Sequence, residues 1–354
     1  MVETSPPPLL RVDRLARHFP VRGFLNRRVG TLRALDDVSF TMTRGEVLGI
    51  VGETGSGKST LGKTLMGIHE PTLGEVWLDG TRIASSGQKR AASIRTRLQY
   101  VYQDPGASLD PRWTLRRSLH EPLIIHTRWP RDRREAKVRE IVAAVDLPPS
   151  HLDLYPHEIS GGQLRRAGLA RILVLHPQLI ILDEPTAGLD VSVQAAVLTL
   201  LQDLRRDFTL TYMVISHDLA VVRSVSDRVA VMYLGRIVEI GPTADVFAAP
   251  RHPYTRALLA TAPRIGGPRV TDSFPLLGGP PDPLQLPWGC RFRTRCRLAM
   301  PECAGLAVQL DYEGERGVAC PRWRHGDMPR PVAPPGTGSS APAIMPRPAE
   351  EPRR

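Results

Sequence analysis

Short apolar runs alternate with segments of helical periodicity along most of this chain. Three runs read as strands that are buried on both faces, at 47–51, 179–182 and 211–215. Residues 131–145 instead carry apolar side chains every three to four positions, which is the spacing of an amphipathic helix. Further helices are predicted at 114–126, 164–175 and 193–206. Buried strands that alternate with helices predict an α/β fold with a parallel sheet at its core.

Other segments alternate apolar and polar residues, as strands with one solvated face do. They lie at 9–15, 34–40 and 73–78, and a hairpin is predicted from 228–233 and 236–240. A basic, glycine-containing insert at 21–31 separates the first two segments. These strands are expected to make the sheet structure mixed, because hairpins add antiparallel pairs.

A glycine-rich loop follows the apolar run at 47–51 and precedes a segment that reads as a helix. Its residues are Gly52, Glu53, Thr54, Gly55, Ser56, Gly57, Lys58, Ser59 and Thr60, which fit the pattern G-x-x-x-x-G-K-[ST]. Glycines let backbone N–H groups approach phosphate oxygens, and a helix N-terminus adds unpaired donors. Lys58 can reach the β- and γ-phosphates, and the Ser59 hydroxyl can bind Mg²⁺. The pattern favours a nucleotide-binding loop (the P-loop, 52–60) over a plain glycine-rich turn.

Two further patterns carry chemistry. Asp183 and Glu184 follow the apolar run at 179–182, where Asp183 can hold the Mg²⁺ shell and Glu184 can orient and polarise a water molecule. A second loop, made of Ser160, Gly161, Gly162 and Gln163, opens a helix and offers a hydroxyl and free N–H groups to an anion. Taken alone, the first would be an acidic turn and the second an ordinary serine helix cap.

Together these patterns resemble the ATP-binding cassette (ABC) ATPases, whose signature is usually Leu-Ser-Gly-Gly-Gln; Ile159 stands in place of the leucine here. The resemblance implies roles for other residues. Gln103 is similar to the glutamine that senses Mg²⁺ or water and the transporter contact. Asp190 ends a segment similar to the D-loop, which crosses a dimer interface, and His217 is similar to the histidine that contacts the γ-phosphate. Phe19 is similar to the aromatic residue that stacks on adenine.

The resemblance also implies a mechanism. Two cassettes face each other head to tail, and each ATP lies between the P-loop of one subunit and the loop 160–163 of the other. Lys58 and His217 contact the γ-phosphate, and hydrolysis assisted by Glu184 removes the group that bridges the halves, which then separate. ATP and Mg²⁺ are therefore the expected ligands, and the chain is expected to be an ATPase.

Two features narrow the resemblance to the ATP-binding subunits of oligopeptide/dipeptide (and nickel) importers. Residues 103–112 resemble the extended segment of those proteins, and a C-terminal extension begins near His252 and carries all four cysteines. The resemblance implies two membrane permeases and a second, related ATPase as partners, with a heterodimer favoured. An extracellular solute-binding protein would act indirectly, and peptides are the expected cargo.

The cysteines Cys290, Cys296, Cys303 and Cys320 allow several interpretations. A disulfide is disfavoured in a cytosolic protein, and a structural zinc site would favour paired C-x2-C ligands, which are absent. The resemblance implies a [4Fe–4S] cluster, with zinc or free thiols as the other readings. Nearby arginines are expected to stabilise the anionic thiolates: Arg291, Arg293, Arg295 and Arg297.

Composition changes this picture little. The net charge of +11 would suit nucleic acid or an anionic membrane, but the basic residues are scattered and not interleaved with aromatic residues. No apolar run reaches ~18 residues, and the first eight residues lack the form of a signal peptide. We therefore expect a peripheral protein on the cytoplasmic face of the cell membrane. The alternative is a soluble cassette ATPase acting on nucleic acid or ribosomes, although such proteins generally carry two cassettes or a coiled-coil insertion.

The predicted organisation is a P-loop ABC-type domain with a helical subdomain, followed by a small cysteine-containing extension. The expected boundaries are a disordered N-terminus at 1–8, the ATPase domain at 9–250 with its helical subdomain at about 104–175, the extension at 251–325 and a disordered tail at 326–354.

Overall fold

The computed structural model describes residues 7–23, 28–86, 94–101, 108–261, 276–305 and 308–324. Predictions that concern Gln103, residues 1–6 and the tail at 326–354 lie outside these ranges. Among the described residues, no helix combines the length and apolar character needed to cross a bilayer.

The main sheet has eight strands in the described part of the chain, in the order β11-β12-β10-β9-β3-β8-β7-β6. Its parallel centre is made of β6 (Leu98–Val101), β7 (Leu179–Asp183), β8 (Thr211–Ile215), β3 (Val47–Val51) and β9 (Arg228–Tyr233). All five residues of β3 and of β8 are buried, because helices or the second sheet cover both faces. The apolar runs predicted as buried strands are therefore strands.

The second sheet is antiparallel and has the order β2-β1-β4-β5. Its strands are β1 (Leu10–Arg22), β2 (Arg28–Met42), β4 (Leu73–Leu78) and β5 (Thr81–Ser85). The pairing of β1 with β2 continues through Val21 and Gly30, so much of the predicted insert at 21–31 extends the two strands. Helix α1 (Lys58–Leu65) packs between the sheets, with Leu61 and Leu65 in a core cluster shared by both.

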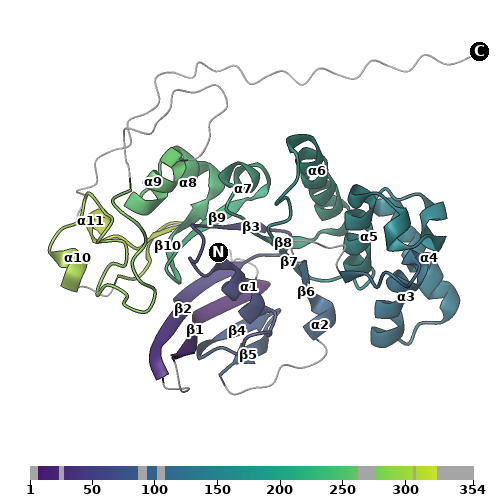
Figure 1. Cartoon of the computed structure of the whole chain (residues 1–354), viewed down its shortest axis with the longest axis horizontal. Helices are drawn as coiled ribbons and strands as arrows, with labels where there is room; N and C mark the ends of the chain where they lie inside the picture. Colours follow the sequence, from purple (N-terminus) through teal and green to yellow (C-terminus); the bar gives the residue numbers. More distant parts are fainter. Residues whose placement is uncertain are drawn as a thin grey trace, which may run out of the picture.

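Helices form one end of the molecule and flank the main sheet (Figure 1). The helical region consists of α3 (Leu115–His126), α4 (Arg131–Ala144), η3 (Pro149–Asp153), η4 (Pro156–Glu158) and α5 (Gly161–Leu173). Short α2 (Ile94–Arg97) precedes β6, whereas α6 (Val191–Phe208) and α7 (Leu219–Val225) follow β7 and β8. The amphipathic pattern at 131–145 buries Val138, Ile141 and Val142, as its spacing predicts.

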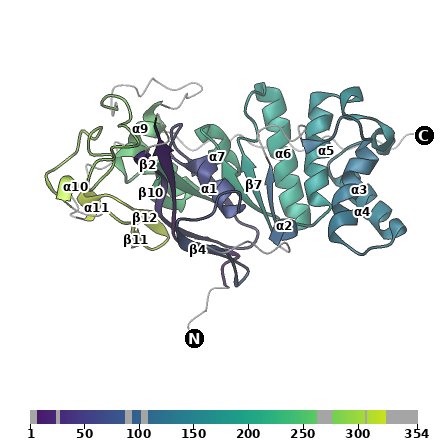
Figure 2. The same cartoon turned by 60° about the horizontal axis from the view of Figure 1, so that its bottom comes forward.

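The C-terminal extension lies at the other end, opposite the helical region in both views (Figures 1 and 2). After β10 (Arg236–Pro242) come α8 (Thr243–Ala248), α9 (Pro253–Thr261), α10 (Glu302–Gly305), β11 (Asp311–Glu313), β12 (Arg316–Val318) and α11 (Pro321–Arg324). Strand β12 pairs with β10 through Glu239 and Ile240. The extension therefore continues the main sheet of the ATPase.

Candidate nucleotide site

The P-loop follows the carboxyl end of β3 and is packed tightly against the rest of the molecule. A Cβ on Gly52, at φ +153°, would lie 2.2 Å from the carbonyl oxygen of Met232, and one on Gly57, at φ +105°, would lie 2.4 Å from that of Ala34. The Gly235 N–H also donates to the carbonyl oxygen of Ser56 at 2.8 Å. Only glycine fits at positions 52 and 57, since the loop lies against both β2 and the β9–β10 turn.

Lys58 points into the P-loop. Its Nζ donates to the carbonyl oxygens of Gly52 at 2.7 Å and Glu53 at 3.0 Å, and lies 3.4 Å from the Ser56 hydroxyl. Burial lowers the pKa of Lys58, while the nearby carboxylates of Glu184 and Asp183 oppose that shift. The P-loop thus surrounds the Lys58 ammonium group. A phosphate bound in this loop could meet both that charge and the backbone N–H groups.

Asp183 joins the P-loop helix to the neighbouring strand. Its Oδ1 accepts a hydrogen bond from the Ser59 hydroxyl at 3.3 Å, and its Oδ2 accepts one from the Tyr100 hydroxyl. These contacts bring the ends of β6 and β7 and the start of α1 to one point, as expected where parallel strands end at one edge. A hydroxyl and a carboxylate side by side are oxygen ligands of the kind Mg²⁺ prefers.

Glu184 takes a left-handed conformation, with φ +54°, directly after β7. Its own N–H donates to the carbonyl oxygen of Ile215 at 2.8 Å, which joins it to the end of β8. Its carboxylate accepts hydrogen bonds from the His217 N–H at 3.1 Å and the Ser216 hydroxyl at 3.3 Å, and the His217 Nδ1 lies 2.9 Å away. The structure therefore brings Glu184, Asp183, His217 and the P-loop to one sheet edge.

The loop 160–163 lies on the helical region, and α5, which it opens, is separate from α1 in both views (Figures 1 and 2). Ser160 and Gln163 form a capping box, with Gln163 N–H to Ser160 Oγ at 3.3 Å and Ser160 N–H to Gln163 Oε1 at 2.9 Å. A Cβ added to Gly161 or Gly162 would meet none of the described residues within 4 Å. Packing within the described part of the chain therefore gives no reason for these two glycines.

Two other residues predicted for the nucleotide site, Asp190 and Phe19, lie at the start of α6 and in β1. Asp190 caps α6 by accepting from the Val193 N–H at 2.9 Å, and its hydrogen bond with Ser192 lowers its pKa. Phe19 lies in β1, where the Arg17 guanidinium carbon is 4.4 Å from its ring centroid and the His69 ring meets it edge-on at 5.2 Å.

The four cysteines gather in the extension. The pKa of Cys290 is raised to about 12 and that of Cys296 to about 11, first by burial and then by repulsion from the other thiolates; burial also raises that of Cys320. Nearby backbone N–H groups oppose these upward shifts in pKa: that of Phe292 for Cys290, that of Leu298 for Cys296, and those of Trp323 and Arg322 for Cys320. Among the described residues, however, no group of three or more Cys, His, Asp or Glu side chains forms a site for one metal ion.

The arginines between the cysteines do not all serve the thiolates. Arg291 pairs with Asp36 and Arg295 pairs with Glu53, both in the ATPase domain. Arg322 is the cation that favours the charged forms of Cys296 and Cys320. The expectation was wrong for Arg291 and Arg295, because each forms its ion pair with a partly buried carboxylate of the ATPase domain. Sequence spacing gave no signal for these long-range pairs.

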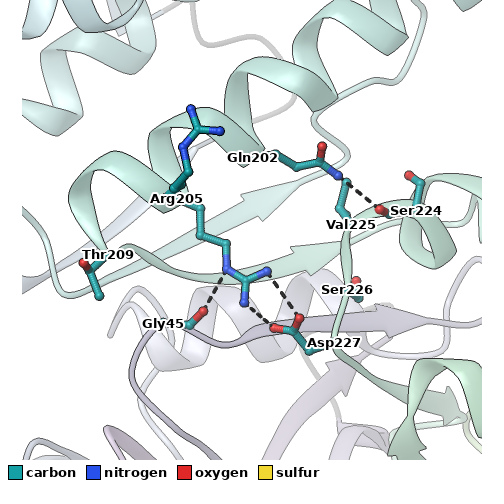
Figure 3. A pocket seen from close by; sticks show the side chains of 9 residues that line it. Gly45, Gln202, Arg205, Thr209, Ser224, Val225, Ser226 and Asp227 are labelled. Atoms are coloured by element: carbon teal, nitrogen blue, oxygen red, sulfur yellow. Dashed lines mark hydrogen bonds and ion pairs between the residues drawn. The ribbon is translucent and has the colours of Figure 1, made fainter. Parts of the chain in front are cut away.

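A surface pocket of about 500 Å³ lies at the opposite, amino end of the parallel strands (Figure 3). Arg205 spans it, donating to the Gly45 carbonyl oxygen at 2.8 Å and to Asp227 at 2.7 Å. Gln202 donates to the Ser224 carbonyl oxygen at 3.2 Å. These contacts hold α6 against the start of β3 and β9, away from the P-loop.

Comparisons with known proteins agree with this geometry. Residues 35–187 match the family model described as ABC transporter, and residues 238–303 match the one described as oligopeptide/dipeptide transporter, C-terminal region. The oligopeptide transport ATP-binding protein AppF of Bacillus subtilis is 46% identical over 299 residues, or 83% of this chain and 91% of AppF. The dipeptide transport ATP-binding protein DppF of Escherichia coli is 43% identical over 313 residues, or 88% of this chain and 94% of DppF.

The fold is shared with solved cassettes. One of them, a dimer in a post-hydrolysis state with ADP and Pi, superposes with a TM-score of 0.56 at 25% identity over 66% of this chain and 98% of that one. None of these matches favours an ATPase acting on nucleic acid or ribosomes. The chain belongs to the ATP-binding proteins of ABC transporters, in the oligopeptide/dipeptide family, and is an ATPase.

Proposed function

We propose that this chain powers the uptake of peptides, as the ATP-hydrolysing subunit of an importer on the cytoplasmic face of the membrane. The names of AppF and DppF, and the match of residues 238–303 to the transporter C-terminal region, support peptides as the cargo. Two permease subunits would supply the path through the membrane. An extracellular binding protein and the permeases would choose the peptide.

The observation that carries the mechanism is the open surface around Gly161 and Gly162. Their missing side chains leave room that none of the described residues uses within 4 Å, at the N-terminus of α5, where N–H groups favour an anion. A nucleotide bound to the P-loop of a partner would fill that space. The dimeric cassette solved with ADP and Pi supports a dimer, and we propose that it is head-to-tail and that the partner is a second, related ATPase.

The proposed chemistry uses the edge where β7 and β8 end. Glu184 would orient a water molecule and accept its proton as the water oxygen bonds to the γ-phosphorus and the bond to the β-phosphate oxygen breaks. Lys58 and His217 would stabilise the charge on the transferred phosphoryl group. Ser59 and Asp183, with Gln103, would hold Mg²⁺, which neutralises phosphate charge when bound.

Other residues would complete the site from a distance. Phe19 would stack on adenine, and the cation of Arg17 against its ring leaves less of its surface for that contact. The segment that ends in Asp190 would meet the partner subunit, and the hydrogen bonds of Asp190 to the start of α6 give it a fixed shape. We also propose the domain division at 9–250 and 251–325 as the functional one.

Affinity purification of the chain from detergent-solubilised membranes tests the proposal. We expect two permeases and a second ATPase to co-purify, and vesicles that contain the complex to take up labelled peptides only with ATP. Recovery of ribosomes or DNA in place of permeases would overturn it. Uptake of a solute other than peptides would overturn the choice of cargo alone.

We further propose that Cys290, Cys296, Cys303 and Cys320 hold a [4Fe–4S] cluster with a structural role. The four gathered thiols suit the sulfur ligands of a cluster, and nearby backbone N–H groups partly oppose the burial that disfavours their thiolates. A cluster spaces its four ligands more widely than one zinc ion, whose Zn–S bonds are about 2.3 Å long. Anaerobically purified protein should contain iron and sulfide and show broad visible absorbance that Cys296→Ser removes. Stoichiometric zinc would overturn the cluster.

A further inference from the structure

The C-terminal extension contacts the P-loop directly at Glu53. Arg295 lies beside Cys296, yet its guanidinium forms a two-point ion pair with Glu53: Nη1 lies 2.8 Å from Oε2, and Nη2 lies 3.2 Å from Oε1. From α9, the Tyr254 hydroxyl accepts a hydrogen bond from the Glu53 N–H at 2.8 Å. Both the side chain and the backbone of this P-loop residue are thus held by the extension. We propose that Arg295 and Tyr254 are positioning residues for the P-loop, so that nucleotide affinity depends on the extension.

Burial strengthens the ion pair of Arg295 with Glu53 and restricts the motion of Tyr254. The side chain of Arg295 is 6% exposed and that of Glu53 is 27% exposed, which limits screening by water. Tyr254 is completely buried, with its ring centroid 4.6 Å from that of Tyr233 and 5.4 Å from that of Phe292. A planar guanidinium on a carboxylate fixes direction as well as distance. The aromatic rings fix the tyrosine hydroxyl in the same way.

The contact continues to the phosphate-binding lysine. Glu53, which donates its N–H to the Tyr254 hydroxyl, also accepts a hydrogen bond on its carbonyl oxygen from the Lys58 Nζ, at 3.0 Å. A change in the orientation of Glu53 therefore moves a partner of Lys58. The opposite side of the P-loop is fixed by Gly52 and Gly57 against backbone atoms, so Glu53 is where the extension can set the loop's shape.

A second anchor keeps the arginine in place. Arg291 pairs with Asp36 and donates to the Leu234 carbonyl oxygen, in the turn whose Gly235 N–H holds the Ser56 carbonyl oxygen. Residues 290–296 thus insert two arginines and Phe292 between the cysteines and the ATPase core. The neighbouring cysteines and the P-loop are connected by a short, buried path.

The test compares purified variants in Mg·ATP binding, with a fluorescent ATP analogue, and in steady-state hydrolysis. We expect Arg295→Met to raise the Kd and KM for ATP about ten- to a hundredfold, with a smaller fall in kcat, because the P-loop binds the phosphates in the ground state as well as in the transition state. Arg295→Lys should restore part of the affinity. Glu53→Gln combined with Arg295→Met should weaken binding no more than either change alone, as members of one pair do.

Arg316→Met is the matched control. Arg316 is a buried arginine of the same extension that pairs with Glu239 at 2.9 Å, on β10 and away from the P-loop. It should lower thermal stability without changing the Kd for ATP. Tyr254→Phe keeps the aromatic packing, so it should fold even if Arg295→Met does not. It removes the hydroxyl that accepts from the Glu53 N–H, so it should weaken ATP binding. The proposal is overturned if Tyr254→Phe and Arg295→Lys bind ATP as tightly as the natural chain, or if Arg316→Met weakens binding as much as they do.

Discussion

The carboxylate of Glu184 lies against His217 at two points: the backbone N–H at 3.1 Å and the ring Nδ1 at 2.9 Å. An ionised carboxylate only accepts hydrogen bonds, so the ring must carry its proton on Nδ1. This fixes the tautomer of the histidine, whose Nε2 is an acceptor in the neutral ring and a donor only when the ring is protonated. The two residues proposed to act on the γ-phosphate therefore position each other.

Replacing Glu184 with Gln should stop turnover without dismantling the site. The amide oxygen can still accept from the His217 N–H, whereas the group that takes the proton from water is lost. We expect kcat to fall by about 10² to 10⁴. ATP should still bind and should hold the protein in an ATP-dependent dimer, visible by size exclusion. Phosphate release at the natural rate would contradict the role assigned to Glu184.

Replacing Gly162 with Ala tests whether the loop 160–163 serves a partner. The new Cβ would meet none of the residues that the structure describes within 4 Å, and alanine is the better helix former, so stability should stay the same or rise by up to about 1 kcal/mol. Hydrolysis should nevertheless fall about tenfold or more, because the methyl group would enter the space of a nucleotide on the partner.

Gly279→Ala is the matched control for Gly162→Ala. A Cβ on Gly279 would also meet no described residue within 4 Å, and Gly279 lies outside the nucleotide site, so thermal melting and hydrolysis should both match those of the natural chain. If Gly162→Ala hydrolyses ATP as fast as this control, the loop does not contact a nucleotide.

The sequence predicted the parts of the fold that depend on local pattern. The apolar runs became β3, β7 and β8, and the motifs that follow them meet because parallel strands end at one edge. Ser59 thus reaches Asp183 across 124 positions of the chain. In this part of the site, strand order alone determines which residues come together.

The position of the C-terminal extension could not be predicted, because it depends on long-range contacts that leave no local pattern in the sequence. Strand β12 is only three residues long, and its pairing with β10 is set by the buried pair of Arg316 and Glu239. The pair of Arg295 and Glu53 spans 242 positions. Arg316 and Glu239 look like ordinary surface residues in the sequence, and the sequence motifs that contain Glu53 and Arg295 do not show that the two residues pair.

Replacing Gly62 with Ala should destabilise the P-loop helix. A Cβ there would lie 2.8 Å from Tyr100 Cε2, 3.0 Å from Ile215 Cδ1 and 3.2 Å from Ile181 Cγ2, so either these side chains or α1 must shift. We expect a loss of about 1–3 kcal/mol in the free energy of unfolding, measured by urea titration. Because alanine normally favours a helix, an increase in stability would show that the helix has room to shift.

His252 should make the protein less stable in mild acid. It is completely buried, its Nδ1 accepts a hydrogen bond from the Tyr254 N–H at 3.0 Å, and burial lowers its pKa to about 3. In the unfolded chain the ring titrates near a pKa of about 6.5. Between these values only the unfolded state binds the proton, so stability is complete above about pH 6.5 and falls as the pH drops, by up to about 1.4 kcal/mol per pH unit.

Comparison with His252→Asn isolates the contribution of His252 to the pH dependence of stability from that of all other titrating groups. The asparagine oxygen can accept the Tyr254 N–H but does not titrate, so the variant should lose a constant amount of stability at every pH from the smaller side chain. The free energy of unfolding of the natural chain should then fall more steeply than that of the variant between pH 6.5 and 5, by up to about 1.4 kcal/mol per unit. Parallel curves would mean that the ring takes up its proton in the folded protein as readily as in the unfolded one, and that the packing around His252 opens to admit it.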